Sequence, residues 1–157
     1  MKKAFIVIVS IVSFFSCDRS PSIEKVVGYY KTNAKSKLMG GYKISTYATL
    51  RINLDTITNQ FVPNSPKRIE FGFYFQQFVS DQMYGTSNKL IQKASGDFEK
   101  IISNNKLKIE PNIYEEWIKK VQYIEIPESQ NNKQKIDQLI LRFKPGNGDP
   151  LTFYRVN

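Results

Sequence analysis

The sequence contains no histidine and a single cysteine. Imidazole is the usual base of Ser-His and Cys-His catalysis and the commonest metal ligand, so these catalytic classes and imidazole metal sites are excluded. One cysteine excludes an intramolecular disulfide and Cys-x-x-Cys metal sites. The sequence also lacks a calcium-binding loop, a phosphate-binding glycine loop and a Ser-x-x-Lys pair. We therefore expect no metal and no other cofactor.

Acidic residues are also scarce, with 14 Asp and Glu against 23 Lys and Arg and a net charge of +9. The cations are scattered along the chain, which is typical of a solvated surface. Apolar residues make up 41% of the 157 residues and aromatic residues 13%, enough to form a core. This length and composition predict one globular domain.

The sequence has no apolar run of the roughly 20 residues that cross a bilayer as a helix. Its longest run, Ala4 to Phe15, follows Lys2 and Lys3 and ends before Asp18. A short apolar run behind a charged start is typical of a signal peptide, which we expect over residues 1–16. Nucleic acid is not an expected partner of an exported chain.

The sole cysteine follows this run, in the order Phe14-Phe15-Ser16-Cys17. This segment resembles the lipobox of bacterial lipoproteins, in which the cysteine receives a diacylglyceryl group and the new amino terminus is acylated. The resemblance implies that Cys17 carries fatty acyl chains such as palmitate and anchors the protein to a membrane. It implies the bacterial cell envelope as the location, in the outer membrane rather than the inner.

The rest of the chain has the pattern of an all-β protein. Residues 17–24 lack apolar periodicity and predict a tether, so the domain is expected over residues 25–157. Short apolar and β-branched runs alternate with Gly, Pro and Asn turns and predict about eight or nine strands. The expected strands are 26–32, 42–54, 68–79, 89–94, 121–126, 138–143 and a last strand from Leu151, together with a hairpin over 97–110. That number closes into a small antiparallel up-and-down β-barrel.

Three segments allow more specific predictions. Asn104-Asn105 predicts the turn of the 97–110 hairpin, because Asn tolerates positive φ. The 138–143 strand and the last strand are expected to pair. Residues 112–120 carry an apolar stripe at helical spacing but run directly into a strand pattern, so a short helix and a strand both remain open there.

The two ends of the domain resemble the bacterial lipocalin-like lipoproteins. The residues that carry this resemblance are Gly28-Tyr29-Tyr30 and Phe153-Tyr154-Arg155. In that family an aromatic residue of the first strand packs beside an arginine of the last strand and closes one end of an eight-stranded barrel. The resemblance implies that Gly28, Tyr30 and Arg155 form the barrel closure here.

Acidic pairs offer little for catalysis. Glu115 and Glu116 are adjacent and so point in different directions, while Asp97 and Glu99 lie where a hairpin places solvent-facing charge. We therefore expect no enzymatic activity.

An aromatic run in the 68–79 strand is the most unusual stretch. Alternation places Phe71, Phe73 and Phe75 on one face. These rings either fill the barrel or line a pocket for a small apolar or amphiphilic ligand, with Tyr47 and Tyr74 as polar groups.

Two functions follow from these alternatives. The first is a lipid-anchored, non-catalytic barrel that binds such a ligand in its interior. The second is a surface adaptor or inhibitor that contacts another envelope protein through loops near residues 32–41, 80–88 and 128–133.

Overall fold

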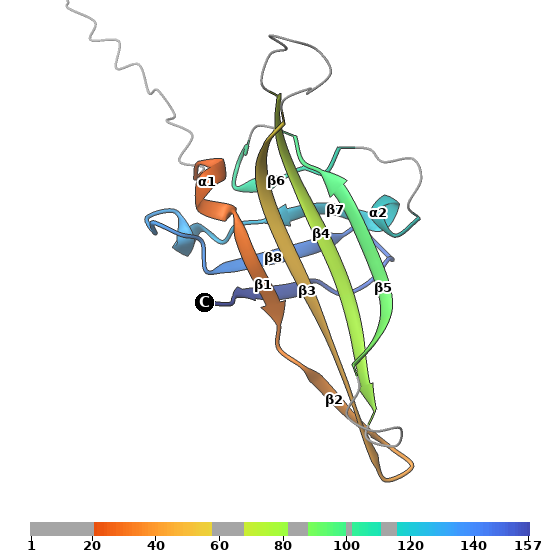
Figure 1. The fold of residues 1–157 in the computed structure, drawn as a ribbon. Coiled ribbons are helices and arrows are strands. Elements are labelled where there is room, and N and C mark those ends of the chain that lie inside the picture. The colour runs from red at the N-terminus through yellow and green to blue at the C-terminus, as the bar shows by residue number, and fades with distance from the viewer. Residues whose placement is uncertain (1–20, 58–67, 82–87, 100–101, 111–115) are drawn as a thin grey trace, which may run out of the picture.

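The computed structural model describes residues 21–57, 68–81, 88–99, 102–110 and 116–157. Within these residues the protein is mostly antiparallel β-sheet with very little helix, which confirms the predicted all-β fold (Figure 1). The predicted signal peptide and Cys17 lie outside the described residues.

The elements follow one another as an up-and-down series. Their bounds are α1 Ile23–Val26, β1 Gly28–Thr32, β2 Lys35–Met39, β3 Tyr42–Ile57, β4 Arg68–Asp81, β5 Asn88–Asp97, β6 Lys106–Leu107, α2 Glu116–Lys120, β7 Val121–Glu125, the 3₁₀ helix η2 Glu128–Gln130, β8 Gln138–Phe143 and β9 Leu151–Arg155. The strand order is β5-β4-β3-β1-β9-β8-β7-β6, and β2 pairs with β3 beside this path. The last strand thus returns to pair with the first.

The sheet curls into a half-barrel whose two ends meet at one edge. A single antiparallel bridge joins Phe98, just after β5, to Ile109, just after β6. Two backbone hydrogen bonds flank the bridge, from Glu99 N to Lys108 O at 2.9 Å and from Glu110 N to Asp97 O at 2.8 Å. As a result β3, β4 and β5 form one wall of the half-barrel and β7, β8 and β9 form the facing wall. The strands of the two walls run in crossing directions (Figure 1).

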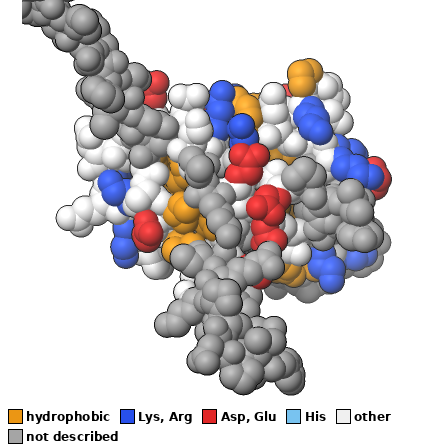
Figure 2. All heavy atoms as spheres, turned by 90° about the horizontal axis from the view of Figure 1, so that it is seen from above, with side chains coloured by type: hydrophobic (Ala, Val, Ile, Leu, Met, Phe, Trp, Pro, Cys, Tyr) orange, Lys and Arg blue, Asp and Glu red, His pale blue; other side chains and the backbone are white. Residues whose placement is uncertain are grey.

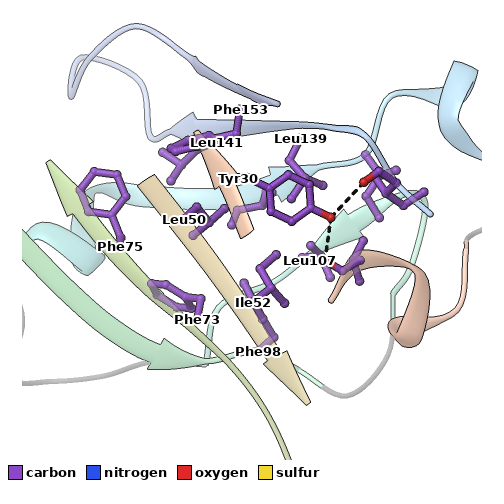
Figure 3. Close-up of a cluster of buried hydrophobic side chains, with 14 of the residues drawn as sticks. Tyr30, Leu50, Ile52, Phe73, Phe75, Phe98, Leu107, Leu139, Leu141 and Phe153 are labelled. Atoms are coloured by element: carbon purple, nitrogen blue, oxygen red, sulfur yellow. Dashed lines mark hydrogen bonds between the residues drawn. The ribbon is translucent and has the colours of Figure 1, made fainter. Parts of the chain in front are cut away.

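The concave side of the sheet holds one hydrophobic core. The long strands alternate as their sequence predicts, with Leu50 and Ile52 of β3 pointing inward beside the phenylalanines of β4. Residues of β8 and β9 such as Leu139 and Phe153 meet them from the opposite side (Figure 3). Fully burying each of these side chains stabilises the fold by about 1.5–3 kcal/mol.

The start of the domain differs from its prediction. Val26, expected in the first strand, is instead the last residue of α1, and β1 begins at Gly28. Ordered structure also begins before Lys25, because α1 starts at Ile23, which packs against the core, and Pro21 is buried. Ile23 and Glu24 of the expected tether therefore belong to α1.

The 112–120 segment forms a helix where it is described. α2 spans Glu116–Lys120, and β7 follows at once from Val121. The side chain of Trp117 on α2 stacks on Phe75 of β4 with ring centroids 4.1 Å apart. This aromatic contact places the helical turn against the open edge of the barrel interior.

The hairpin predictions are confirmed. Asn104 and Asn105 have positive φ angles of 50° and 57° and form the turn. β8 and β9 pair in register from Gln138 with Tyr154 to Leu141 with Leu151.

The segment near residues 32–41, expected as a loop, is largely strand β2. β2 and the ends of β3, β4 and β5 extend beyond the barrel as a projecting sheet, which we call the β-tongue (residues 35–47, 78–81 and 88–91) (Figure 1). The tongue and α1 lie at opposite ends of the molecule (Figure 1).

Candidate functional site

The structure brings Gly28, Tyr30 and Arg155 together at the seam between the first and last strands. Tyr30 on β1 and Arg155 on β9 are paired in the sheet, so their side chains lie on the same face. The Arg155 guanidinium carbon is 4.8 Å from the centre of the Tyr30 ring, within the range of a cation–π contact. Tyr30 is fully buried, so the pair covers the end of the core near α1.

Arg155 also holds the two ends of the domain by hydrogen bonds. Its Nε donates to Ile136 O at 2.8 Å, and its Nη1 donates to Val27 O at 3.0 Å. Its Nη2 donates to Lys25 O at 3.0 Å and to the Tyr30 hydroxyl at 2.7 Å. A planar guanidinium suits this task because its donors have fixed directions.

The Tyr30 hydroxyl lies among backbone carbonyls. Its oxygen is 2.8 Å from Val26 O and 3.1 Å from Ile136 O (Figure 3). Burial raises the pKa of Tyr30 to about 12, and the positive charge of Arg155 opposes this rise. The hydroxyl is therefore neutral at physiological pH and already occupied, which suits a structural role rather than acid–base chemistry.

Gly28 leaves room for the guanidinium. A Cβ atom at this position would collide with Nη1 of Arg155. Glycine is thus the residue that lets the backbone of β1 approach Arg155. The arrangement can tie strands and chain ends together.

Three of the four phenylalanines of β4 lie inside the core. Phe71, Phe73 and Phe75 expose 1%, 4% and 0% of their surface. Phe98 contacts both Phe71 and Phe73, with ring centroids 4.9 and 5.0 Å apart. Together with the stack of Phe75 on Trp117, these contacts occupy the space in which an interior ligand was expected.

The two tyrosines are not near those rings. Tyr74 lies on the outer face and is 39% exposed. Tyr47 also lies outside, stacked on Phe78 at 5.1 Å, with Lys31 Nζ 4.2 Å from its ring centre. The structure therefore separates the residues that were expected to form one pocket.

A hollow of about 270 Å³ does lie beside Tyr47. It forms where β1 ends and β2 bends away from β9, and we call it the notch. Its lining includes Thr32, Lys35, Tyr47, Leu151 and Tyr154. The notch combines aromatic rings with a cation.

The acidic candidates form ordinary surface contacts where they are described. Glu116 accepts a hydrogen bond from Lys119 Nζ at 2.6 Å, and this bond lowers the pKa of Glu116. Glu99 lies 3.9 Å from Lys108 Nζ, and Glu115 lies outside the described residues. Across the described part of the chain, no group of three or more His, Cys, Asp or Glu could hold a metal ion.

Sequence reasoning missed the end of the β-tongue. Leu38, Met39 and Tyr42 are among the exposed large hydrophobic residues, beside the Gly40-Gly41 turn. The signal was present in the sequence, because the Gly-Gly turn is flanked by two runs in which lysines and apolar residues mix.

Comparison of the chain with protein-family models, curated proteins and solved structures found no match in any of the three. Among the described helices, none has the length and apolar character needed to cross a membrane.

Proposed function

We propose that the protein is a lipid-anchored, non-catalytic protein of the bacterial cell envelope, whose barrel is a scaffold for contacts with another envelope protein. The observation that carries this proposal is the filled interior around Phe71, Phe73 and Phe75. A packed core leaves the outer surface, rather than the interior, to make functional contacts.

The anchor in this proposal is Cys17, on the strength of its resemblance to a lipobox. Acylated Cys17 would lie four residues before the buried Pro21. So short a connection keeps the α1 end of the barrel close to the leaflet, which we take to belong to the outer membrane.

The loop at Glu128–Lys133 is the surface that best fits the adaptor function. Glu128 and Asn132 are exposed, while Gln130 is buried and its Oε1 accepts a hydrogen bond from Asp137 N at 3.0 Å. Backbone bonds from Asn131 N to Glu128 O and from Lys133 N to Gln130 O shape the loop further. An exposed loop held in one conformation binds a partner at a small entropic cost.

Binding of a small amphiphilic ligand remains a second candidate, favoured by the notch beside Tyr47. The ring of Tyr47 and the charge of Lys35 would face the apolar and anionic parts of such a ligand. This site replaces the barrel interior as the place where a ligand would bind.

Photo-crosslinking in intact cells tests the adaptor function. A photoreactive residue is placed at Ser129 in the Glu128–Lys133 loop, and at the exposed Asp149 of the β8–β9 loop as a matched control. We expect a discrete adduct with one envelope protein from position 129, none from position 149, and its loss when Cys17→Ser removes the anchor. Equal adducts from both positions would contradict the proposal.

Two further measurements separate its parts. Metabolic labelling with palmitate should mark the parent chain and not Cys17→Ser, and an unlabelled parent would overturn the anchor alone. Native mass spectrometry of the purified protein should show no retained ligand. A retained ligand that is lost in Tyr47→Ala would favour the notch over the adaptor function.

A further inference from the structure

The end of the β-tongue exposes apolar side chains at a tight turn. Leu38, Met39 and Tyr42 expose 74%, 55% and 44% of their surface. Between them Gly40 and Gly41 have φ angles of 58° and 85°, and a Cβ at either would have open space around it. We call residues 35–46 the tongue tip, and its outer end is a two-residue β-hairpin turn.

Both faces of this hairpin carry apolar and cationic side chains, in a different order on each. The pairs Lys37 with Ile44, Leu38 with Lys43 and Met39 with Tyr42 fix the register. Because successive side chains alternate between faces, Met39 and Tyr42 lie outermost on one face and Leu38 on the other.

Cations lie next to or behind these apolar side chains on each face. Lys37 and Lys35 share the face of Met39, while Lys43 is opposite Leu38 on the other face. Both faces of the hairpin therefore have an exposed apolar side chain near the turn and at least one lysine. On the Leu38 face the next pair toward the barrel is Ser36 with Ser45.

The part of the chain that forms the tip has cations and no acidic residue of its own. The sequence has no Asp or Glu between Lys25 and Leu54, and the nearest acidic residue by strand pairing is Asp81, opposite Ile44. Figure 2 shows the opposite end from above, where acidic side chains lie near the centre and lysines and arginines lie beside and around them. The tip is thus cationic, whereas the opposite end carries charges of both signs.

From this geometry we propose that the tongue tip inserts into a leaflet of anionic phospholipid. Leu38 and Met39 enter the boundary between headgroups and acyl chains, and Tyr42 lies at the interface, where its ring and hydroxyl both find a suitable environment. Lys35, Lys37 and Lys43 then lie at the level of the phosphates.

The presence of exposed apolar and cationic side chains on both faces favours a leaflet over a protein surface as the occupant. A protein partner covers one face of a hairpin, whereas a lipid layer surrounds an inserted tip on all sides. This inference does not depend on acylation of Cys17.

Fluorophores at the tip test the insertion directly. In a Cys17→Ser background, the full chain receives a single labelling site as Leu38→Cys or Tyr42→Cys, one on each face, or as Asn147→Cys in the exposed β8–β9 loop. Each is labelled with an environment-sensitive probe and mixed with vesicles of phosphatidylcholine, with or without half phosphatidylglycerol. The readout is local, so attachment of the chain elsewhere does not mimic it.

We expect a blue shift and quenching by brominated lipid at positions 38 and 42, only with phosphatidylglycerol, and no change at position 147. Replacing Lys35 and Lys37 by Gln should raise the lipid concentration for half-maximal response about 25-fold, from about fivefold per lysine. Unchanged fluorescence of Trp117 shows that each variant remains folded.

Three results would overturn the proposal. The first is a tip probe whose emission does not shift when anionic vesicles are added. The second is an equal shift with vesicles of phosphatidylcholine alone. The third is a shift on one face of the hairpin only. The last result would assign the tip to a protein surface. None of them bears on the crosslinking result at Ser129, so the two proposals fail separately.

Discussion

Replacing Arg155 by methionine should destabilise the domain more than the same replacement of Arg142, the other arginine that makes an ion or hydrogen-bond contact on the neighbouring strand. Methionine keeps much of the apolar stem but removes the donors to the carbonyls of Lys25, Val27 and Ile136 and to the Tyr30 hydroxyl. It also removes the cation above the Tyr30 ring.

The size of the effect follows from these contacts. A hydrogen bond to a charged group contributes about 1.5–3 kcal/mol, and four of them on one side chain are not additive. Water can reach part of the site, since Arg155 is only partly buried, and it replaces some of the lost bonds. We therefore expect a loss of about 3–4 kcal/mol from a free energy of unfolding on the order of 5–15 kcal/mol.

The single tryptophan provides the assay. Trp117 stacks on Phe75 in the core, so its emission reports unfolding in urea. Arg142→Met is the matched control on the neighbouring strand β8, where Arg142 Nε donates to Glu125 Oε2 at 2.7 Å. The side chains of Arg142 and Glu125 are 36% and 30% exposed, so Arg142→Met should lower the free energy of unfolding by less than about 1 kcal/mol. If Arg155→Met costs no more than the control, the seam does not hold the chain ends and our reasoning is wrong.

Two further predictions concern Tyr30 and the Asn104 turn. Because the pKa of Tyr30 is raised to about 12 in the folded protein, against about 10 when unfolded, stability should be constant below pH 10. It should then fall by about 2 kcal/mol between pH 10 and pH 12, and urea titrations across this range should lack that step in Tyr30→Phe. Asn104 has a φ of 50°, so Asn104→Ala should lower the free energy of unfolding by about 1 kcal/mol in the same titration. Asn104→Gly should leave it almost unchanged, and equal losses in the two variants would refute the turn assignment.

Strands that face the core could be predicted from sequence. The 138–143 strand has the same bounds in the structure, because its apolar side chains alternate and a Pro/Gly loop limits it. β2 could not be predicted in this way, since all five of its residues are exposed and none marks a buried face. Its strand conformation comes from pairing with β3.

The contacts of the site were only partly predictable. The proximity of Tyr30 and Arg155 followed from a family resemblance, but the carbonyl acceptors of Arg155 are backbone atoms, whose position no side chain signals. The filling of the interior depends on Phe98 and Trp117, which reach the β4 rings from other parts of the chain. Sequence alternation gives the face of a residue but not the volume left in front of it.

The continuity of β3 and β4 connects the barrel to the tongue. Their pairing runs without interruption from Ile57 with Arg68 at the α1 end to Ile44 with Asp81 in the tongue. One hydrogen-bonded ladder therefore supports both parts, and the 16 residues of β3 span about 50 Å. A tip on a flexible loop would lose conformational freedom on reaching a surface, whereas the tip of a shared ladder is already ordered. The barrel thus holds the exposed Leu38, Met39 and Tyr42 at a fixed distance from α1, where they can contact a surface without a further loss of backbone freedom.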